Sequence, residues 1–128
     1  MALTPDLTPD PATREVKPAL LRGLRCRCPR CGEGKVFDGY IRVAKSCSAC
    51  GLDLTKQRAD DGPAYIVILI VGHIMGLMML ELSTLMRDSP FLVAGICCAA
   101  ALGLAIPMLP RVKGAFIAYQ WAKGLHGF

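Results

Sequence analysis

The amino-acid sequence predicts a small cysteine-rich β domain followed by a two-helix transmembrane α-hairpin. Two Cys-x-x-Cys motifs predict the domain, since fourteen residues separate Gly32, at the end of the first motif, from Cys47, at the start of the second. Charge distribution predicts the hairpin. Residues 1–60 hold eleven of the fifteen Lys and Arg residues, whereas residues 64–109 hold one Arg and two acidic residues. The 128-residue chain therefore divides into a polar half and an apolar half.

The first element is a predicted disordered tail over residues 1–19. This stretch repeats Thr-Pro-Asp and is poor in bulky apolar residues. A docking peptide is the alternative. Residues 1–20 also lack the apolar core and small-residue cleavage site of a secretory signal peptide. We therefore expect reduced thiols in the cytoplasm rather than disulfides.

Residues 20–60 are predicted to form the small zinc-ribbon β domain. Short runs between Lys35 and Val43 carry β-branched and aromatic residues and predict two or three short strands, with glycines at the turns. About forty residues cannot bury a self-sufficient core. A bound zinc ion contributes about 10–16 kcal/mol in small zinc peptides, which is enough to hold such a domain folded.

The predicted metal ligands are Cys28, Cys31, Cys47 and Cys50. Zinc prefers four tetrahedral soft ligands, and each Cys-x-x-Cys turn presents two sulfurs to one ion. Four thiolates leave no open position, so we expect a structural Zn²⁺ site rather than a catalytic one. Iron–sulfur or rubredoxin-like iron and a redox dithiol are the alternatives. Cys26 is a spare thiol two residues from a ligand, but the Cys-Pro-x-Cys-Gly form favours Cys28.

The hairpin is predicted over residues 63–110, with helices at about 64–86 and 91–109. Helices of 23 and 19 residues span about 34 and 28 Å, close to the roughly 30 Å of a bilayer core. The short turn at Arg87–Pro90 makes the two helices antiparallel neighbours. Residues 111–128 are predicted to form an amphipathic cytoplasmic C-terminal segment. A cytoplasmic end of the second helix is the alternative.

Several residues inside the predicted helices are candidates for chemistry. Ionisable groups at mid-membrane depth are functional candidates, but His73 is more simply explained as a neutral histidine hydrogen-bonded to the partner helix. Cys97 and Cys98 are more simply explained as small apolar residues. Glu81 lies near the end of its helix and is interpreted as structural. Small-residue stripes are expected to pack inside the hairpin or, alternatively, against another membrane subunit. These stripes comprise Gly72 and Gly76 on the first helix, and Gly95, Ala99 and Gly103 on the second.

Basic residues near the helix ends predict the orientation. Lys45, Lys56 and Arg58 precede the first helix and Arg111 and two lysines follow the second, so both termini and the zinc ribbon are expected in the cytoplasm. Basic residues also surround the first Cys pair. We expect them to meet anionic lipid headgroups or a protein in preference to nucleic acid. These residues are Arg22, Arg25, Arg27 and Arg30.

The chain resembles the DUF983 family of small bacterial membrane proteins. The resemblance rests on Arg27–Phe37, Cys47–Asp53, Asp61–Ala64, Arg111-x-Lys113-Gly114 and Gln120, within residues 22–123. It implies the bacterial inner membrane, two helices and a cytoplasmic zinc ribbon. Similar members are often encoded near haem–copper cytochrome c oxidase and its assembly factors.

We therefore expect a non-enzymatic accessory protein with a structural zinc ribbon, which assists the assembly or stability of such an oxidase through a membrane protein partner. His73, Glu81 and His126 are the only plausible general bases in the membrane and C-terminal parts, and spacing suggests no partner for any of them. One alternative is a metal- or haem-handling membrane protein that uses His73 and nearby Met and Cys residues. The other is a membrane-tethered nucleic-acid-binding ribbon.

Overall fold

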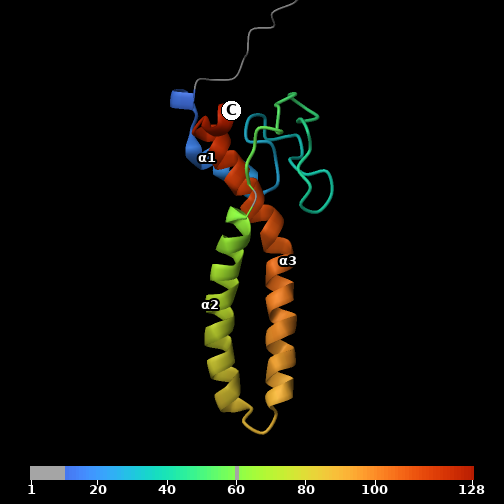
Figure 1. The fold of residues 1–128 in the computed structure, drawn as a ribbon, viewed down its shortest axis with the longest axis vertical. Coiled ribbons are helices and arrows are strands. Elements are labelled where there is room, and N and C mark those ends of the chain that lie inside the picture. Colours follow the sequence, from blue (N-terminus) through green and yellow to red (C-terminus); the bar gives the residue numbers. More distant parts are fainter. Residues whose placement is uncertain (1–10, 60) are drawn as a thin grey trace, which may run out of the picture.

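The computed structural model describes residues 11–59 and 61–128. Its helices are α1 (Val16–Leu24), α2 (Gly62–Leu85) and α3 (Pro90–Ala122), with 3-10 turns η1 (Pro11–Thr13) and η2 (Leu125–Gly127). α2 and α3 form a long antiparallel hairpin (Figure 1). α1 and residues 26–59, here called the cysteine module, gather at one end of the hairpin beside the C-terminal part of α3 (Figure 1). Most of the predicted tail, residues 1–10, lies outside the described residues.

The cysteine module contains no β-strand within residues 26–59. Instead, three isolated antiparallel bridges pair Arg27 with Lys35, Phe37 with Val43, and Ser46 with Asp53. The predicted short strands are therefore not confirmed, although the antiparallel pairing that they imply is present at single positions.

α1 begins inside the predicted disordered tail and ends inside the predicted zinc-ribbon domain. Residues 16–19, assigned above to the tail, form the first part of this nine-residue helix. Ala19 and Gly23 are four residues apart, lie on one face and are buried. Packing of that face against α3 supplies the stability that a helix this short lacks alone.

Contact between α1 and α3 depends on two glycines. A Cβ atom built on Gly23 would collide with the carbonyl oxygen of Gly114, and one built on Gly114 would collide with the carbonyl oxygen of Gly23. The two backbones therefore approach at a distance that a side chain would prevent. Ile117 and Ala118 continue the contact as part of the main buried core.

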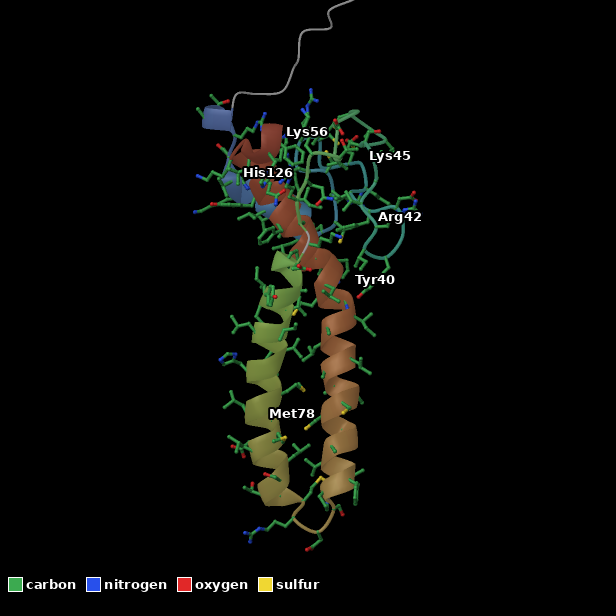
Figure 2. The ribbon with its side chains drawn as sticks, viewed as in Figure 1. Tyr40, Arg42, Lys45, Lys56, Met78 and His126 are labelled. Atoms are coloured by element: carbon green, nitrogen blue, oxygen red, sulfur yellow. The ribbon has the colours of Figure 1, made fainter. Side chains whose placement is uncertain are left out.

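The α2 side of the α2–α3 interface is made by residues larger than the glycines of the predicted stripe, whereas the half-buried residues on α3 include Cys97, Ala100, Ala101 and Ala105. On α2, buried and half-buried residues recur three or four positions apart, as in an antiparallel helix pair. Met78 points between the two helices (Figure 2). A Cβ atom built on Gly72, Gly76, Gly95 or Gly103 would meet nothing within 4 Å. Packing inside the hairpin therefore does not explain the glycines of the two stripes.

α3 continues beyond the predicted end at residue 109. It runs through Pro107 and Pro110 to Ala122, so residues 111–122 are the end of the second membrane helix rather than a separate segment. α3 bends where it reaches the cysteine module (Figure 1), as expected when prolines remove helical hydrogen bonds. Beyond the bend, its buried residues pack into the core of the module. These residues are Gly114, Ile117, Ala118, Gln120, Trp121 and Ala122.

Both hairpin helices are long and apolar enough to cross a membrane, with mean hydropathy of 2.2 and 2.3 over the most apolar 18-residue stretch of α2 and of α3. Only 11% of the most apolar part of α2 and 6% of that of α3 is buried inside the protein. The exposed side chains include Leu77, Leu85 and Phe91. Since apolar surface on this scale is unfavourable in water, the hairpin needs an apolar surrounding such as lipid.

Candidate metal centre

The two Cys-x-x-Cys motifs fold into similar turns. In the first, the amide of Gly32 donates to the carbonyl of Cys28 at 2.8 Å, and in the second the amide of Gly51 donates to the carbonyl of Cys47 at 3.0 Å. Both glycines are left-handed, with φ of 71° and 74°. The glycine after each second cysteine therefore lets the chain reverse so that each turn presents two sulfurs on one side.

The four sulfurs form one compact group. The Sγ atoms of Cys28 and Cys50 are 3.6 Å apart, as are those of Cys31 and Cys47, and all four lie within 4.8 Å of one another. Ligands at about 2.3 Å from a central tetrahedral ion lie about 3.8 Å apart. The arrangement therefore fits a single ion. In a multi-iron cluster the cysteines bind separate irons, which requires a wider arrangement.

Backbone amides stabilise negative charge on these sulfurs. Burial raises the pKa of the Cys28 thiol, although two backbone amides oppose the rise. Burial acts on Cys31 as well, but the amides of Gly34 and Glu33 and two neighbouring cysteines outweigh it and lower its pKa to about 6. Burial also raises the pKa of the Cys50 thiol. Thiolates are the form that binds metal, so a cation would have to displace protons from Cys28 and Cys50, whereas Cys31 is largely ionised near neutral pH.

Little space remains around the sulfurs. Cys28 and Cys47 are buried, and the other two are half-buried. A Cβ atom built on Gly34 would collide with Cys47 Sγ, so this glycine allows the two turns to approach. With four sulfurs around one point, a bound ion has no position left for substrate.

Two of the four arginines around the first Cys pair donate hydrogen bonds to backbone carbonyls of the module while their side chains remain exposed. Arg22 of α1 donates to the carbonyls of Pro29 and Arg30 at 3.0 and 3.2 Å. Arg27 donates to the carbonyl of Glu33 at 3.0 Å. These cations lie beside the cysteine turns, where they offset the negative charge of a four-thiolate site.

The remaining candidate residues are not brought together. Within residues 11–59 and 61–128, the four cysteines form the only group of three or more His, Cys, Asp or Glu side chains placed to hold one ion. Cys26 is outside it and instead ends α1 in a left-handed conformation, with φ of 57°. His73, Glu81 and Cys98 are exposed and Cys97 is half-buried. Nδ1 of His73 lies 2.6 Å from the carbonyl oxygen of Leu69.

Two residues of α3 outside the Cys motifs hydrogen-bond to the module. The spacing of the cysteines gives no indication of these contacts. Gln120 is 3% exposed; its side-chain oxygen accepts from the amide of Arg58 at 3.0 Å, and its side-chain nitrogen donates to the carbonyl of Arg58 at 2.9 Å. Lys113 donates to the carbonyl of Ile41 at 3.1 Å. Gln120 was named above for the family resemblance alone, and Lys113 for the resemblance and for the orientation. A polar residue on an otherwise apolar helix face is the signal that singles out Gln120.

One family model matches the chain, and its description is "Protein of unknown function (DUF983)". The match covers residues 37–121, which include the second Cys pair, the hairpin and most of the end of α3. It is narrower than the resemblance over residues 22–123 and does not reach Cys28 and Cys31. Comparisons with curated proteins and with solved structures gave no match. Since the matched region is more than half of the chain, this protein belongs to the DUF983 family.

Proposed function

We propose that the protein is a non-enzymatic membrane accessory protein whose cysteine module is a zinc ribbon with a structural Zn²⁺. The observation that carries the proposal is the closed group of four sulfurs within 4.8 Å. Zinc is the proposed ion because tetrahedral four-thiolate sites suit it and because it needs no redox partner. The residues that would hold it are Cys28, Cys31, Cys47 and Cys50.

We place the protein in the bacterial inner membrane with the module and both termini in the cytoplasm. This orientation follows from the basic residues on the module's side of the hairpin, against the single Arg87 in the turn at the other end. Reporter fusions at residue 128 and in the turn at Asp88 test it. Cytoplasmic reporter activity at Asp88 would reverse the orientation.

The exposed small-residue face of α2 supports a membrane protein partner. Gly72 and Gly76 border a groove of about 540 Å³ that also includes His73. Grooves of small residues let a second helix approach closely, and a histidine at this depth gains from a polar partner. The partner that we propose is a haem–copper cytochrome c oxidase or one of its assembly factors. Its identity is supported by the family resemblance alone.

Affinity purification of the full chain in mild detergent, with mass spectrometry and metal analysis of one sample, tests the proposal. We expect about one zinc per chain and recovery of an oxidase component. G72L/G76L should lose that component and keep the zinc. L80I, at another exposed position of α2, should keep both. The oxidase role would be ruled out by its absence from the purified sample together with normal oxidase levels in a deletion strain.

His73 supports a second candidate, metal or haem handling. If Nδ1 donates to the carbonyl of Leu69, Nε2 is left as an acceptor at the exposed surface of α2. Titration of copper or haem into the zinc-loaded protein, compared with H73A, tests this function. Equal binding by the two proteins would exclude His73 as a ligand.

A further inference from the structure

A cavity of about 340 Å³ lies between the cysteine module and α3, and three cationic side chains line it. Its cations are Arg25, Arg27 and Lys35, and its apolar wall includes Phe37, Tyr40 and Pro110. In the part of the chain that the structure describes, no Asp or Glu lines this cavity. Its ligand must therefore offer negative charge together with apolar surface.

The cavity lies at a defined depth relative to the hairpin. From Pro90 to Pro110, α3 rises about 30 Å at 1.5 Å per residue, which matches the hydrocarbon thickness of a bilayer. Pro110 is therefore at the level where acyl chains end and headgroups begin. Arg111, the first charged residue of α3, adds positive charge at this level. Tyr40 lies beside α3 in the same region (Figure 2), as aromatic residues do at membrane interfaces.

The side chains in the cavity remain available for a ligand. Arg25 and Lys35 are exposed, and neither is a metal ligand. Arg27 uses one guanidinium nitrogen for the carbonyl of Glu33, which fixes its position and leaves further N–H donors. Arginine and lysine recognise phosphate by charge-assisted hydrogen bonds, while the apolar wall suits a glycerol backbone.

We propose that this cavity binds the phosphate of an anionic phospholipid from the leaflet on the module's side. The site, which rests on the membrane location proposed above, holds the cysteine module against the membrane surface. It is separate from the four-sulfur centre and from the glycine face of α2. Free inorganic phosphate shares this chemistry but lacks the apolar part that the wall of the cavity would contact.

Binding of a phospholipid to the delipidated, zinc-loaded full chain in detergent tests the site. Short-chain phosphatidylglycerol is titrated, with phosphatidylcholine and inorganic phosphate as comparison ligands, and native mass spectrometry counts bound molecules. We expect saturable binding of one phosphatidylglycerol, with much weaker binding of both comparison ligands. The double variant R25Q/K35Q should bind about 30-fold more weakly, since each basic residue near a lipid surface contributes about fivefold.

R42Q/K45Q is the matched control. It removes the same charge from the outer edge of the module, away from α3 (Figure 2), and should bind within about twofold of the wild type. If R25Q/K35Q does not fold, K35Q alone changes an exposed side chain and should still cost about fivefold.

Four results would overturn the proposal. If both double variants weakened phosphatidylglycerol binding equally, the lipid would be attracted by the overall positive charge rather than bound at a specific site. Equal binding of phosphatidylcholine, or tight binding of inorganic phosphate alone, would exclude an anionic lipid as the ligand. Displacement of the lipid by an oligonucleotide at low salt would indicate a nucleic-acid surface instead. Zinc content and partner recovery do not depend on this cavity, so failure here is distinguishable from failure of the proposed function.

Discussion

The hydroxyl of Tyr40 donates a hydrogen bond to the carbonyl oxygen of Ile106, 66 residues later in the chain. In a regular helix this carbonyl would accept from the amide of residue 110, but Pro110 has no N–H. A side chain of the cysteine module therefore replaces a hydrogen bond that the membrane helix lacks. The bond lies where α3 bends, so it couples the position of the module to the shape of the helix.

This relationship predicts a specific coupling between Tyr40 and Pro110. Y40F should destabilise the protein by about 1 kcal/mol, since it leaves the carbonyl of Ile106 without its donor. P110A restores a backbone N–H, so Y40F in that background should cost little. Thermal unfolding of the four proteins in detergent gives the coupling energy. Equal losses in both backgrounds would show that Tyr40 does not act through this carbonyl.

The contact between Gly23 and Gly114 predicts a second effect. G23A or G114A should force α1 away from α3 and destabilise the protein by about 1–3 kcal/mol, because the added methyl group meets backbone rather than a flexible side chain. G95A is the control, since a Cβ there meets nothing within 4 Å. It should be neutral or stabilise the helix by up to about 1 kcal/mol. Unfolding midpoints and proteolysis of α1 measure the difference, and an unchanged midpoint in G23A would contradict it.

Substitution of single cysteines should distinguish the metal ligands from Cys26, which is not expected to bind the metal. C28S and C47S should lose the bound metal and the fold of the module, because three thiolates hold the ion weakly and both positions are buried. C26S should keep about one metal per chain. Metal analysis of purified protein measures both results. Metal loss in C26S with retention in C28S would mean that Cys26 replaces Cys28 as ligand.

Chelation should unfold one part of the molecule and leave the other intact. Trp121, the only tryptophan in the sequence, is 5% exposed and packs in the core that the end of α3 shares with the module. Metal removal should therefore shift its fluorescence to longer wavelength. α2 and residues 90–109 of α3 contribute nothing to that core, so their helical circular dichroism should persist. Unchanged fluorescence after complete removal would show that the metal does not hold the core.

The two hydrogen bonds between the Gln120 side chain and the backbone of Arg58 predict that Gln120 stabilises the packing of the module against α3. Q120E replaces the N–H donor that faces the carbonyl of Arg58 by a carboxylate oxygen, and it should cost about 1–3 kcal/mol because both groups would then be acceptors. Q57E changes the same amide at a half-buried position whose oxygen accepts from the amide of Ala59. Since a carboxylate still accepts, Q57E should be nearly neutral. Similar unfolding midpoints for the two variants would show that the Gln120–Arg58 hydrogen bonds do not stabilise this contact.

The amino-acid sequence alone determined the parts of this protein whose signals are local. The spacing of Cys28, Cys31, Cys47 and Cys50 identified the sulfur cluster, since each pair forms within one turn. Long apolar runs with few charged residues identified both hairpin helices. Proline composition, however, placed residues 16–19 in a tail, because a nine-residue helix depends on packing that local signals do not report.

Only the tertiary structure decided how these parts meet. The sequence pattern predicted that the second helix ends before Pro110, and that the glycine stripes pack either inside the hairpin or against another membrane subunit. In the folded chain, Tyr40 compensates for the proline and α3 continues, while the stripe glycines face outward. Gln120, Lys113 and the Gly23–Gly114 contact join segments far apart in the chain. Periodicity and spacing describe neighbours along the chain, whereas these contacts depend on how separate elements pack in three dimensions.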